Sequence, residues 1–163
     1  MMVFKEIQRF DQWWLRVLFL IIALIAAGPL LFDYQEVIHS QKELTSVLVS
    51  LGIIAALFLA FWYLFKLETK VDEAGIHYRF LPFHGRTRHK PWAEIKELKL
   101  TKYHPIKDYG GWGYRIGFGK KKALTVSGRT GIAIYFKNGS RLLLGTQDTA
   151  RAQEAVDYYK SKL

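Results

Sequence analysis

The stretch SVLVSLGIIAALFLAFWYLF, from Ser46 to Phe65, holds 20 residues without a charge. About 20 consecutive apolar residues are needed for an α-helix to cross the hydrocarbon core of a bilayer. A similar stretch, WWLRVLFLIIALIAAGPLLF, runs from Trp13 to Phe32 and carries a single charge, that of Arg16. The two stretches predict a hairpin of two transmembrane helices, with spans at about 13–32 and 46–65.

Two other interpretations of these stretches stay open. One is a pair of core helices in a soluble protein, although little in the rest of the chain is large enough to cover both. The other is a cleavable signal peptide, with Ala26 and Ala27 as a nominal cleavage site. The first apolar stretch continues past these alanines to Phe32 and a second stretch follows it, which favours membrane helices.

The distribution of basic residues predicts the orientation. Residues 66–163 contain 20 Lys and Arg against 9 Asp and Glu, a net charge of +11 in a chain whose total is +10. Lys and Arg accumulate on the cytoplasmic side of membrane proteins. We therefore expect a multi-pass protein of the inner (cytoplasmic) membrane, with both termini in the cytoplasm and the short connection between the spans outside.

Beyond Lys66 the pattern changes to short alternating segments with turn residues between them. This pattern predicts strands within 66–71, 76–83, 91–103, 111–118, 123–128, 130–136 and 140–146, with a basic loop at 84–90. Asn138-Gly139 is a strong hairpin signal. The last segment has Ala152, Ala155, Val156 and Tyr159 on one face of a helix, capped by Thr146 or Asp148. Two domains follow: 1–65 with the membrane hairpin, and 66–163.

Seven strands followed by one helix is the order of a pleckstrin-homology-like (PH-like) domain. The tail GIAIYFKNGSRLLLGTQDTARAQEAV resembles the end of bacterial PH-like domains. More narrowly, YHPIKDYGGWGYR, ALTVSGRTGIAIYF and LLGTQ resemble a family of small, uncharacterised bacterial membrane proteins in which two spans precede such a domain. The resemblance implies an α+β membrane protein with a PH-like barrel or roll of about seven antiparallel strands, capped by a C-terminal helix. It implies no catalytic residues.

The glycine-rich stretch DYGGWGYRIGFGKKK, from Asp108 to Lys122, fits neither the P-loop nor the dinucleotide-binding spacing. Its glycines favour a fold-determining corner, and a recognition surface is the alternative. If it is such a surface, the candidate residues for binding a ligand or partner are Asp108, Trp112 and Arg115. The candidate basic residues for contact with anionic lipids are Lys66, Lys70, Arg86, Arg88, Lys90, Lys120, Lys121 and Lys122. Solvated turns are the simpler interpretation of the same lysines.

Composition argues against most catalytic chemistry. The chain has no cysteine, so disulfides, zinc-thiolate sites and thiol nucleophiles are excluded. The histidines match no zinc pattern, and no Gly-x-Ser-x-Gly elbow is present. We expect no catalytic residues, no cofactor, no metal and no nucleic-acid partner, the last because the aromatic residues needed for base stacking are not evident.

The sequence therefore predicts a non-enzymatic, membrane-anchored protein whose cytoplasmic domain binds anionic lipid headgroups or a partner protein. Two alternatives remain. One is a structural subunit of a larger membrane complex. The other is an interfacial lipid-modifying enzyme, which would require His104, Asp108 or Tyr109 to converge with Arg115.

Overall fold

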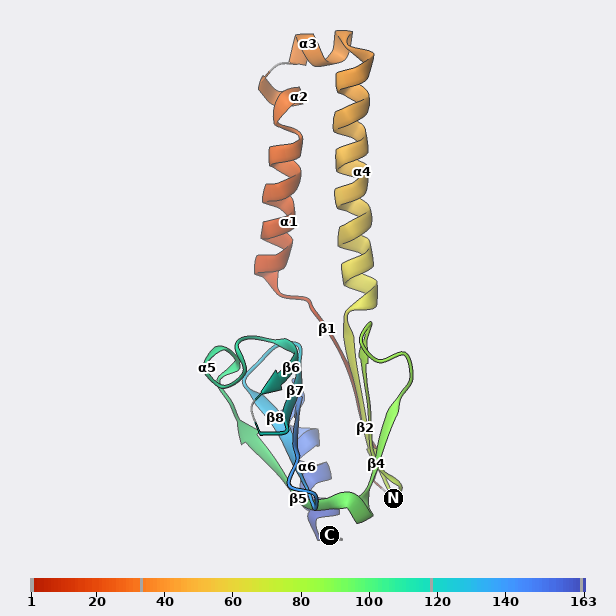
Figure 1. Ribbon diagram of the computed structural model, residues 1–163, viewed down its shortest axis with the longest axis vertical. Helices are drawn as coiled ribbons and strands as arrows, with labels where there is room; N and C mark the ends of the chain where they lie inside the picture. The colour runs from red at the N-terminus through yellow and green to blue at the C-terminus, as the bar shows by residue number, and fades with distance from the viewer. Residues whose placement is uncertain (1, 33, 118, 162) are drawn as a thin grey trace. The chain divides into compact units, whose positions relative to one another are not determined.

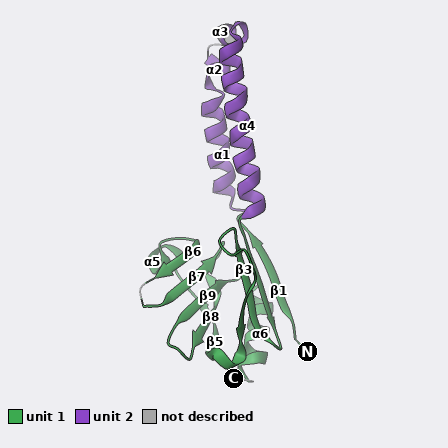
Figure 2. Cartoon of the chain, turned by 45° about the vertical axis from the view of Figure 1, so that its right-hand side comes forward, with its two compact units in different colours: residues 1–10, 65–163 green, residues 11–64 purple. Residues whose placement is uncertain are grey.

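The computed structural model describes residues 2–32, 34–117, 119–161 and 163, without the side chains of Tyr34 and Glu36. Phe118, where the expected strand 111–118 ends, is thus outside the described residues. The chain divides into two compact units (Figure 2). Residues 11–64 form the helical unit, and residues 1–10 together with 65–163 form the β unit.

The helical unit consists of α1 (Trp13–Ala26), α2 (Gly28–Phe32), α3 (Tyr34–His39) and α4 (Gln41–Leu64). α1 and α4 pack against each other through aromatic rings. The ring centroid of Phe19 lies 5.0 Å from that of Phe58 and 6.3 Å from that of Phe61. The guanidinium of Arg16 lies 5.1 Å from the ring of Trp62, so the one charge of the first apolar stretch is held against the partner helix.

The expectation of two transmembrane helices is wrong. The stretch 13–32 is interrupted after the 14 residues of α1, whose length of about 21 Å is less than the roughly 30 Å of a bilayer core. Pro29 accounts for the interruption, because proline has no N–H to donate and its ring clashes with the carbonyl four residues earlier. Among the described residues, only the 24-residue α4 is long and apolar enough to cross a membrane.

The β unit contains two sheets and one long helix (Figure 1). The four-stranded sheet has the order β1-β2-β3-β4, and its strands are β1 (Phe4–Arg9), β2 (Lys66–Asp72), β3 (Gly75–Leu81) and β4 (Arg88–Pro91). The five-stranded sheet has the order β5-β8-β9-β7-β6, and its strands are β5 (Ile95–Lys102), β6 (Gly113–Gly117), β7 (Lys121–Thr125), β8 (Thr130–Phe136) and β9 (Arg141–Gly145). The short helices are η1 (Trp92–Glu94), which joins the sheets, and α5 (Pro105–Tyr109).

One hydrophobic core joins both sheets to α6 (Thr149–Lys160). Its fully buried residues include Leu67, Ile76 and Phe80 of the four-stranded sheet, Leu98, Leu124, Ile132, Ile134 and Leu144 of the five-stranded sheet, and Ala152, Ala155, Val156 and Tyr159 of α6. The four α6 residues are those that the helical spacing predicts. Asp148 is the N-cap, and its carboxylate accepts a hydrogen bond of 3.1 Å from the Arg151 N–H.

The expectation of a barrel of antiparallel strands is also wrong. The described strands form two separate sheets and no closed barrel. β7 and β9 pair in parallel, because β8 and β9 form a hairpin that returns β9 to the centre of the sheet, between β8 and β7. Local alternation identifies strands, but it does not determine which strands become neighbours.

All seven expected strands are present, and the structure adds β1 and β4. The first three residues of β4 lie in the segment 84–90, which was expected as a basic loop. β1 lies in the expected membrane domain 1–65, yet it pairs with β2 along its whole length, from Phe4 opposite Val71 to Arg9 opposite Lys66. Consequently the helical unit is an insertion between two neighbouring strands of one sheet.

Candidate functional site

A pocket with a basic rim lies in the β unit where β3 and β4 come near β7 and β9. Its volume is about 340 Å³, within the usual range for small-ligand sites. The cationic residues around it are Arg88, Lys90, Lys120, Lys122 and Arg141. The remaining residues of the lining are Tyr78, Phe136, Ser140 and Leu142. We call this cavity the basic pocket.

Few carboxylates compensate the positive charges of the basic pocket. Lys90 pairs with Glu94, with 2.8 Å between its Nζ and the carboxylate Oε2. The other four cationic side chains form no ion pair with a carboxylate of the described residues. Like charges held close together repel, so this arrangement has a free energy cost that a bound anion would remove.

The floor of the basic pocket is apolar and buried. Phe136 and Leu142 are almost fully buried there, and the Lys90 ammonium lies 5.3 Å from the Phe136 ring. Tyr78 is 6 % exposed, and its hydroxyl interacts with Arg88. Burial raises the pKa of Tyr78, and the charges of Arg88 and Lys90 offset part of the rise. The Tyr78 hydroxyl is therefore protonated at neutral pH and can donate a hydrogen bond to an anion.

His84 lies close enough to two of these cations to feel their charge. Burial lowers the pKa of His84, and the charges of Arg88 and Lys122 lower it further. Its Nδ1 accepts a hydrogen bond of 3.2 Å from the Phe80 N–H, an arrangement that fits a neutral ring. The charges of Arg88 on β4 and Lys122 on β7 thus both lower the pKa of one buried ring, although the two residues are far apart in the sequence.

Local backbone geometry positions the basic side chains. Gly75 begins β3 at a φ of +144°, and a Cβ at that position would lie 2.2 Å from the Lys90 carbonyl oxygen, so glycine allows β4 to pair closely with β3. On β7, alternation directs adjacent lysines to opposite faces of the sheet. Lys122 lines the basic pocket, whereas Lys121 lines a different hollow.

The predicted recognition residues do not form one site. The carboxylate of Asp108 accepts a hydrogen bond of 2.7 Å from the His104 N–H at the start of α5. Arg115 Nε donates to the Trp112 carbonyl oxygen at 3.2 Å, and Trp112 Nε1 donates to the Gly128 carbonyl oxygen at 3.1 Å. These bonds hold the chain in shape. No interaction joins Asp108 to Arg115 among the described residues.

Glycine has a backbone role in the stretch between these residues. Gly110 ends α5 in the left-handed conformation, with φ at +72°. Its N–H donates to the Ile106 carbonyl and the Gly111 N–H donates to the Pro105 carbonyl, which closes the helix end. Gly110 therefore serves the geometry of the chain at the end of α5.

The eight predicted basic residues separate into groups. Arg88, Lys90, Lys120 and Lys122 come together in the basic pocket. Lys66 and Lys70 lie on β2, where they pair with Glu68 and Asp72 at 2.7 Å each. Arg86 is exposed in the loop before β4. Lys121 lines a hollow of about 310 Å³ on the five-stranded sheet, together with Asp108 and Tyr109.

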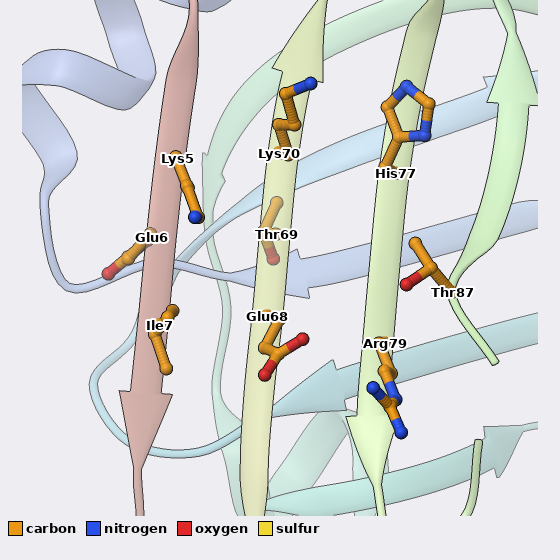
Figure 3. A pocket seen from close by; sticks show the side chains of 9 residues that line it. All are labelled: Lys5, Glu6, Ile7, Glu68, Thr69, Lys70, His77, Arg79 and Thr87. Atoms are coloured by element: carbon orange, nitrogen blue, oxygen red, sulfur yellow. The ribbon is translucent and has the colours of Figure 1, made fainter. Parts of the chain in front are cut away.

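A further hollow of about 280 Å³ lies on the four-stranded sheet (Figure 3). Lys5, Lys70, His77 and Arg79 extend into it from neighbouring strands, and Glu68 lies among them. Its charges are largely compensated within the protein, because Lys70 pairs with Asp72 and Arg79 donates to the carbonyl oxygens of His84 and Gly85. The basic pocket is therefore the better candidate for an anion.

Sequence reasoning missed Tyr78, Ser140 and Arg141 as pocket residues. Arg141 joins the site because β9 pairs in parallel with β7, which was not expected. Its guanidinium lies 4.5 Å from the Tyr135 ring, so it borders both the basic pocket and the hollow that contains Lys121. The sequence indicates only that Tyr78 is an inward-facing strand residue. The pairing of β3 with β4 places it opposite Arg88.

No protein-family model, curated protein or solved structure matches the chain.

Proposed function

We propose that the protein is anchored in a membrane by its helical unit and that its β unit binds the headgroup of an anionic lipid in the basic pocket. The observation that carries the binding proposal is the set of five cationic side chains around a recessed cavity whose lining contains no carboxylate. The resemblance to small membrane proteins with a second, non-membrane domain is consistent with this proposal but supplies no ligand.

The exposed apolar surface of the helical unit supports anchoring. α1 has no buried residue, and Val47 is the only buried residue of α4 among those described. Ile25 is 72 % exposed and Leu57 is 59 % exposed. Soluble proteins rarely expose so many large apolar side chains in one region, whereas a bilayer would cover them. With a length of about 36 Å, α4 is sufficient for a crossing.

Charge supports a cytoplasmic location of the β unit. Arg9 and Lys66 lie opposite each other on β1 and β2, so the segments before and after the helical unit belong to one sheet. The excess of positive charge in residues 66–163 favours the cytoplasmic side. The negative surface potential of a cytoplasmic leaflet would then attract the β unit.

Anchoring is tested by extraction of native membranes with alkaline carbonate. We expect the full-length protein to stay in the pellet and to be released only by detergent. Its appearance in the carbonate supernatant would contradict the proposal. Because the chain has no cysteine, one introduced by Asn138→Cys in the β8–β9 turn would be a unique label. An impermeant maleimide should label this variant only after the cells are opened.

Headgroup binding is tested by titration calorimetry of the full-length protein in neutral detergent. Short-chain phosphatidylglycerol and phosphatidic acid should bind, and short-chain phosphatidylcholine should not. Binding should weaken as salt rises from 50 to 500 mM. Equal heats for neutral and anionic lipids would refute the proposal, and binding of an acidic peptide in place of both lipids would favour a protein partner.

A further inference from the structure

We infer that the basic pocket selects a terminal phosphate monoester over a phosphate diester. This inference rests on the proposed function and deepens it, since it names the chemical class of the anion. The shape of the cavity, its uncompensated charges and its hydrogen-bond donors all favour the monoester.

The shape of the cavity favours a phosphate monoester. The cavity is lined by residues of both sheets, and its lining includes the buried side chains of Tyr78, Phe136 and Leu142. A terminal phosphate can enter such a cavity with its single ester oxygen directed outward. A diester phosphate has an organic substituent on two of its oxygens, so one substituent would have to occupy the cavity with the phosphate. The monoester therefore reaches the floor with less hindrance.

The uncompensated positive charge of the cavity also favours a monoester. Four of the five cationic residues have no carboxylate partner among the described residues: Arg88, Lys120, Lys122 and Arg141. A diester carries one negative charge, whereas a phosphate monoester carries between 1.5 and 2 at pH 7, as for phosphorylated side chains. The monoester compensates more of the repulsion between these cations. It also has three terminal oxygens, which can accept from several donors at once.

The hydrogen-bond donors around the cavity are suited to the three terminal oxygens of a phosphate monoester. Arg88 supplies a planar guanidinium from β4, and Lys120 and Lys122 supply ammonium groups from the other sheet. The Tyr78 hydroxyl at the floor interacts with Arg88 and can donate its own proton to a phosphate oxygen. Donors from both sheets thus surround one small volume, which favours a compact, highly charged group over an extended anionic surface.

The test compares lipids that differ in ester number. Full-length protein in neutral detergent is titrated with short-chain phosphatidic acid, which is a monoester, and with short-chain phosphatidylglycerol, which is a diester. We expect tighter binding of phosphatidic acid by about tenfold. If both lipids bind equally and both depend on Lys122, the selectivity is refuted and the proposed function stands. If neither lipid binds, the proposed function itself fails.

Free ligands distinguish the source of the monoester. Inorganic phosphate and glycerol 3-phosphate are titrated in the same detergent without lipid. We expect both to compete with phosphatidic acid, which supports the pocket chemistry. Binding of glycerol 3-phosphate as tight as that of phosphatidic acid would also support the monoester class, and would assign a soluble ligand rather than a lipid. Failure of either ligand to compete at millimolar concentration would overturn the inference.

Adjacent lysines provide a matched control. Lys122→Gln and Lys121→Gln each remove one charge from the same strand, but only Lys122 lines the basic pocket. We expect Lys122→Gln to weaken phosphatidic acid binding roughly five- to tenfold, on the basis of the contribution of one basic residue to anion attraction. Lys121→Gln should change it less than twofold. Equal losses in both variants would show non-specific attraction and overturn the inference.

The pH dependence gives an independent readout. The second proton of a phosphate monoester dissociates near pH 6, so its binding should tighten roughly tenfold between pH 5 and 7.5, and diester binding should not. Tyr78 keeps its proton over this range, because burial raises its pKa. A proton taken up by His84 would add positive charge and would strengthen the binding of either anion at low pH. The inference therefore predicts that the ratio of monoester affinity to diester affinity rises between pH 5 and 7.5, and a ratio that stays constant or falls would contradict it.

Discussion

The carboxylate of Glu6 accepts a hydrogen bond of 2.7 Å from the hydroxyl of Thr146, a residue 140 positions later in the chain. The same carboxylate accepts the Gln147 N–H at 2.8 Å. Two residues along β1, Gln8 Nε2 donates to the Gly145 carbonyl oxygen at 2.6 Å. The strand that precedes the helical unit is thus bound to the loop that precedes α6, so residues 66–163 alone would lack part of their own fold.

Removal of the Glu6 carboxylate should destabilise the β unit. Glu6→Ala leaves the Gln147 N–H without its acceptor and leaves the Thr146 hydroxyl with only its longer bond to the Asp148 carbonyl oxygen, at a cost of about 2 kcal/mol. Thermal unfolding followed by circular dichroism should show a midpoint lower by about 10 °C. Lys5→Ala on the exposed face of β1 is the control and should change the midpoint little. An unchanged midpoint for Glu6→Ala would show that the hydrogen bonds of this carboxylate contribute no stability.

Acid should destabilise the protein through Asp72. Burial alone would raise the pKa of this carboxylate, but hydrogen bonds from Lys70, the Ala74 N–H and His77 outweigh it and lower the pKa from 3.8 to about 2. Between these values the unfolded chain binds a proton that the folded chain does not. The stabilisation, up to about 2 kcal/mol, is therefore complete above pH 4 and is lost as the pH falls toward 2.

Asp72→Asn separates this effect from general acid unfolding. The variant should be less stable than the unmodified protein at pH 6, and the difference should shrink between pH 4 and pH 2. Unfolding midpoints measured at both ends of this range check the prediction. Glu97→Gln, at an exposed carboxylate on β5, is the control. A constant difference across the range would show that Asp72 does not titrate as described.

Alkaline pH should destabilise the protein through Tyr103. Burial raises its pKa from 10.0 to about 12, and the nearby Thr125 hydroxyl offsets part of the rise. Between pH 10 and 12 the unfolded chain has lost a proton that the folded chain still holds, so stability falls by up to roughly 2–3 kcal/mol. Tyr103→Phe should reduce this fall. Urea midpoints at pH 9 and pH 12 test it, and an identical fall in both proteins would contradict it.

Gly75→Ala should damage the basic pocket. The added Cβ would lie 2.2 Å from the Lys90 carbonyl oxygen, so β4 must move away from β3. We expect a loss of about 2 kcal/mol in stability together with weaker lipid binding. Gly85→Ala is the matched control, because no atom lies within 4 Å of its Cβ position. Wild-type affinity in Gly75→Ala would show that β4 does not position the pocket.

Phe19 should hold α1 against α4. Phe19→Ala removes its ring contacts with Phe58 and Phe61, which we expect to weaken the helix pair by about 1 kcal/mol. A disulfide between cysteines placed on α1 and α4 reports the pairing, and its formation should slow in the variant. Leu20→Ala, at an exposed side chain of α1, is the control. Equal disulfide rates in both variants would show that the rings do not determine the pairing.

Sequence patterns predicted the elements in which apolar residues are buried and polar residues are exposed. Alternation identified β2, β3 and β8, and helical spacing identified the buried face of α6. β1 was missed because its pattern is inverted. Gln8 is buried and Ile7 is 51 % exposed, so period-two hydrophobicity gives no signal there. Gln8 is stable in that position because its partner is the carbonyl oxygen of Gly145.

The candidate site was predicted in part. The basic residues 88, 90, 120 and 122 were recognised by charge, but as separate surface groups rather than as one pocket. The choice between Lys121 and Lys122 depends on which face of β7 is covered, and the inclusion of Arg141 depends on the parallel pairing with β9. Strand order and register are properties of the whole sheet, so they cannot be read from one strand.

The sequence by itself determined the composition of the parts: an apolar helical segment, a basic β-rich segment, a C-terminal amphipathic helix, and the absence of cysteine. Composition and period suffice for these features because each depends on contacts between residues close together in the chain. Only the tertiary structure decided that β1 belongs to the β unit, that the strands form two sheets, and that cations from two sheets surround one cavity. Those features depend on contacts between residues far apart in the chain, whose geometry exists only in the folded protein.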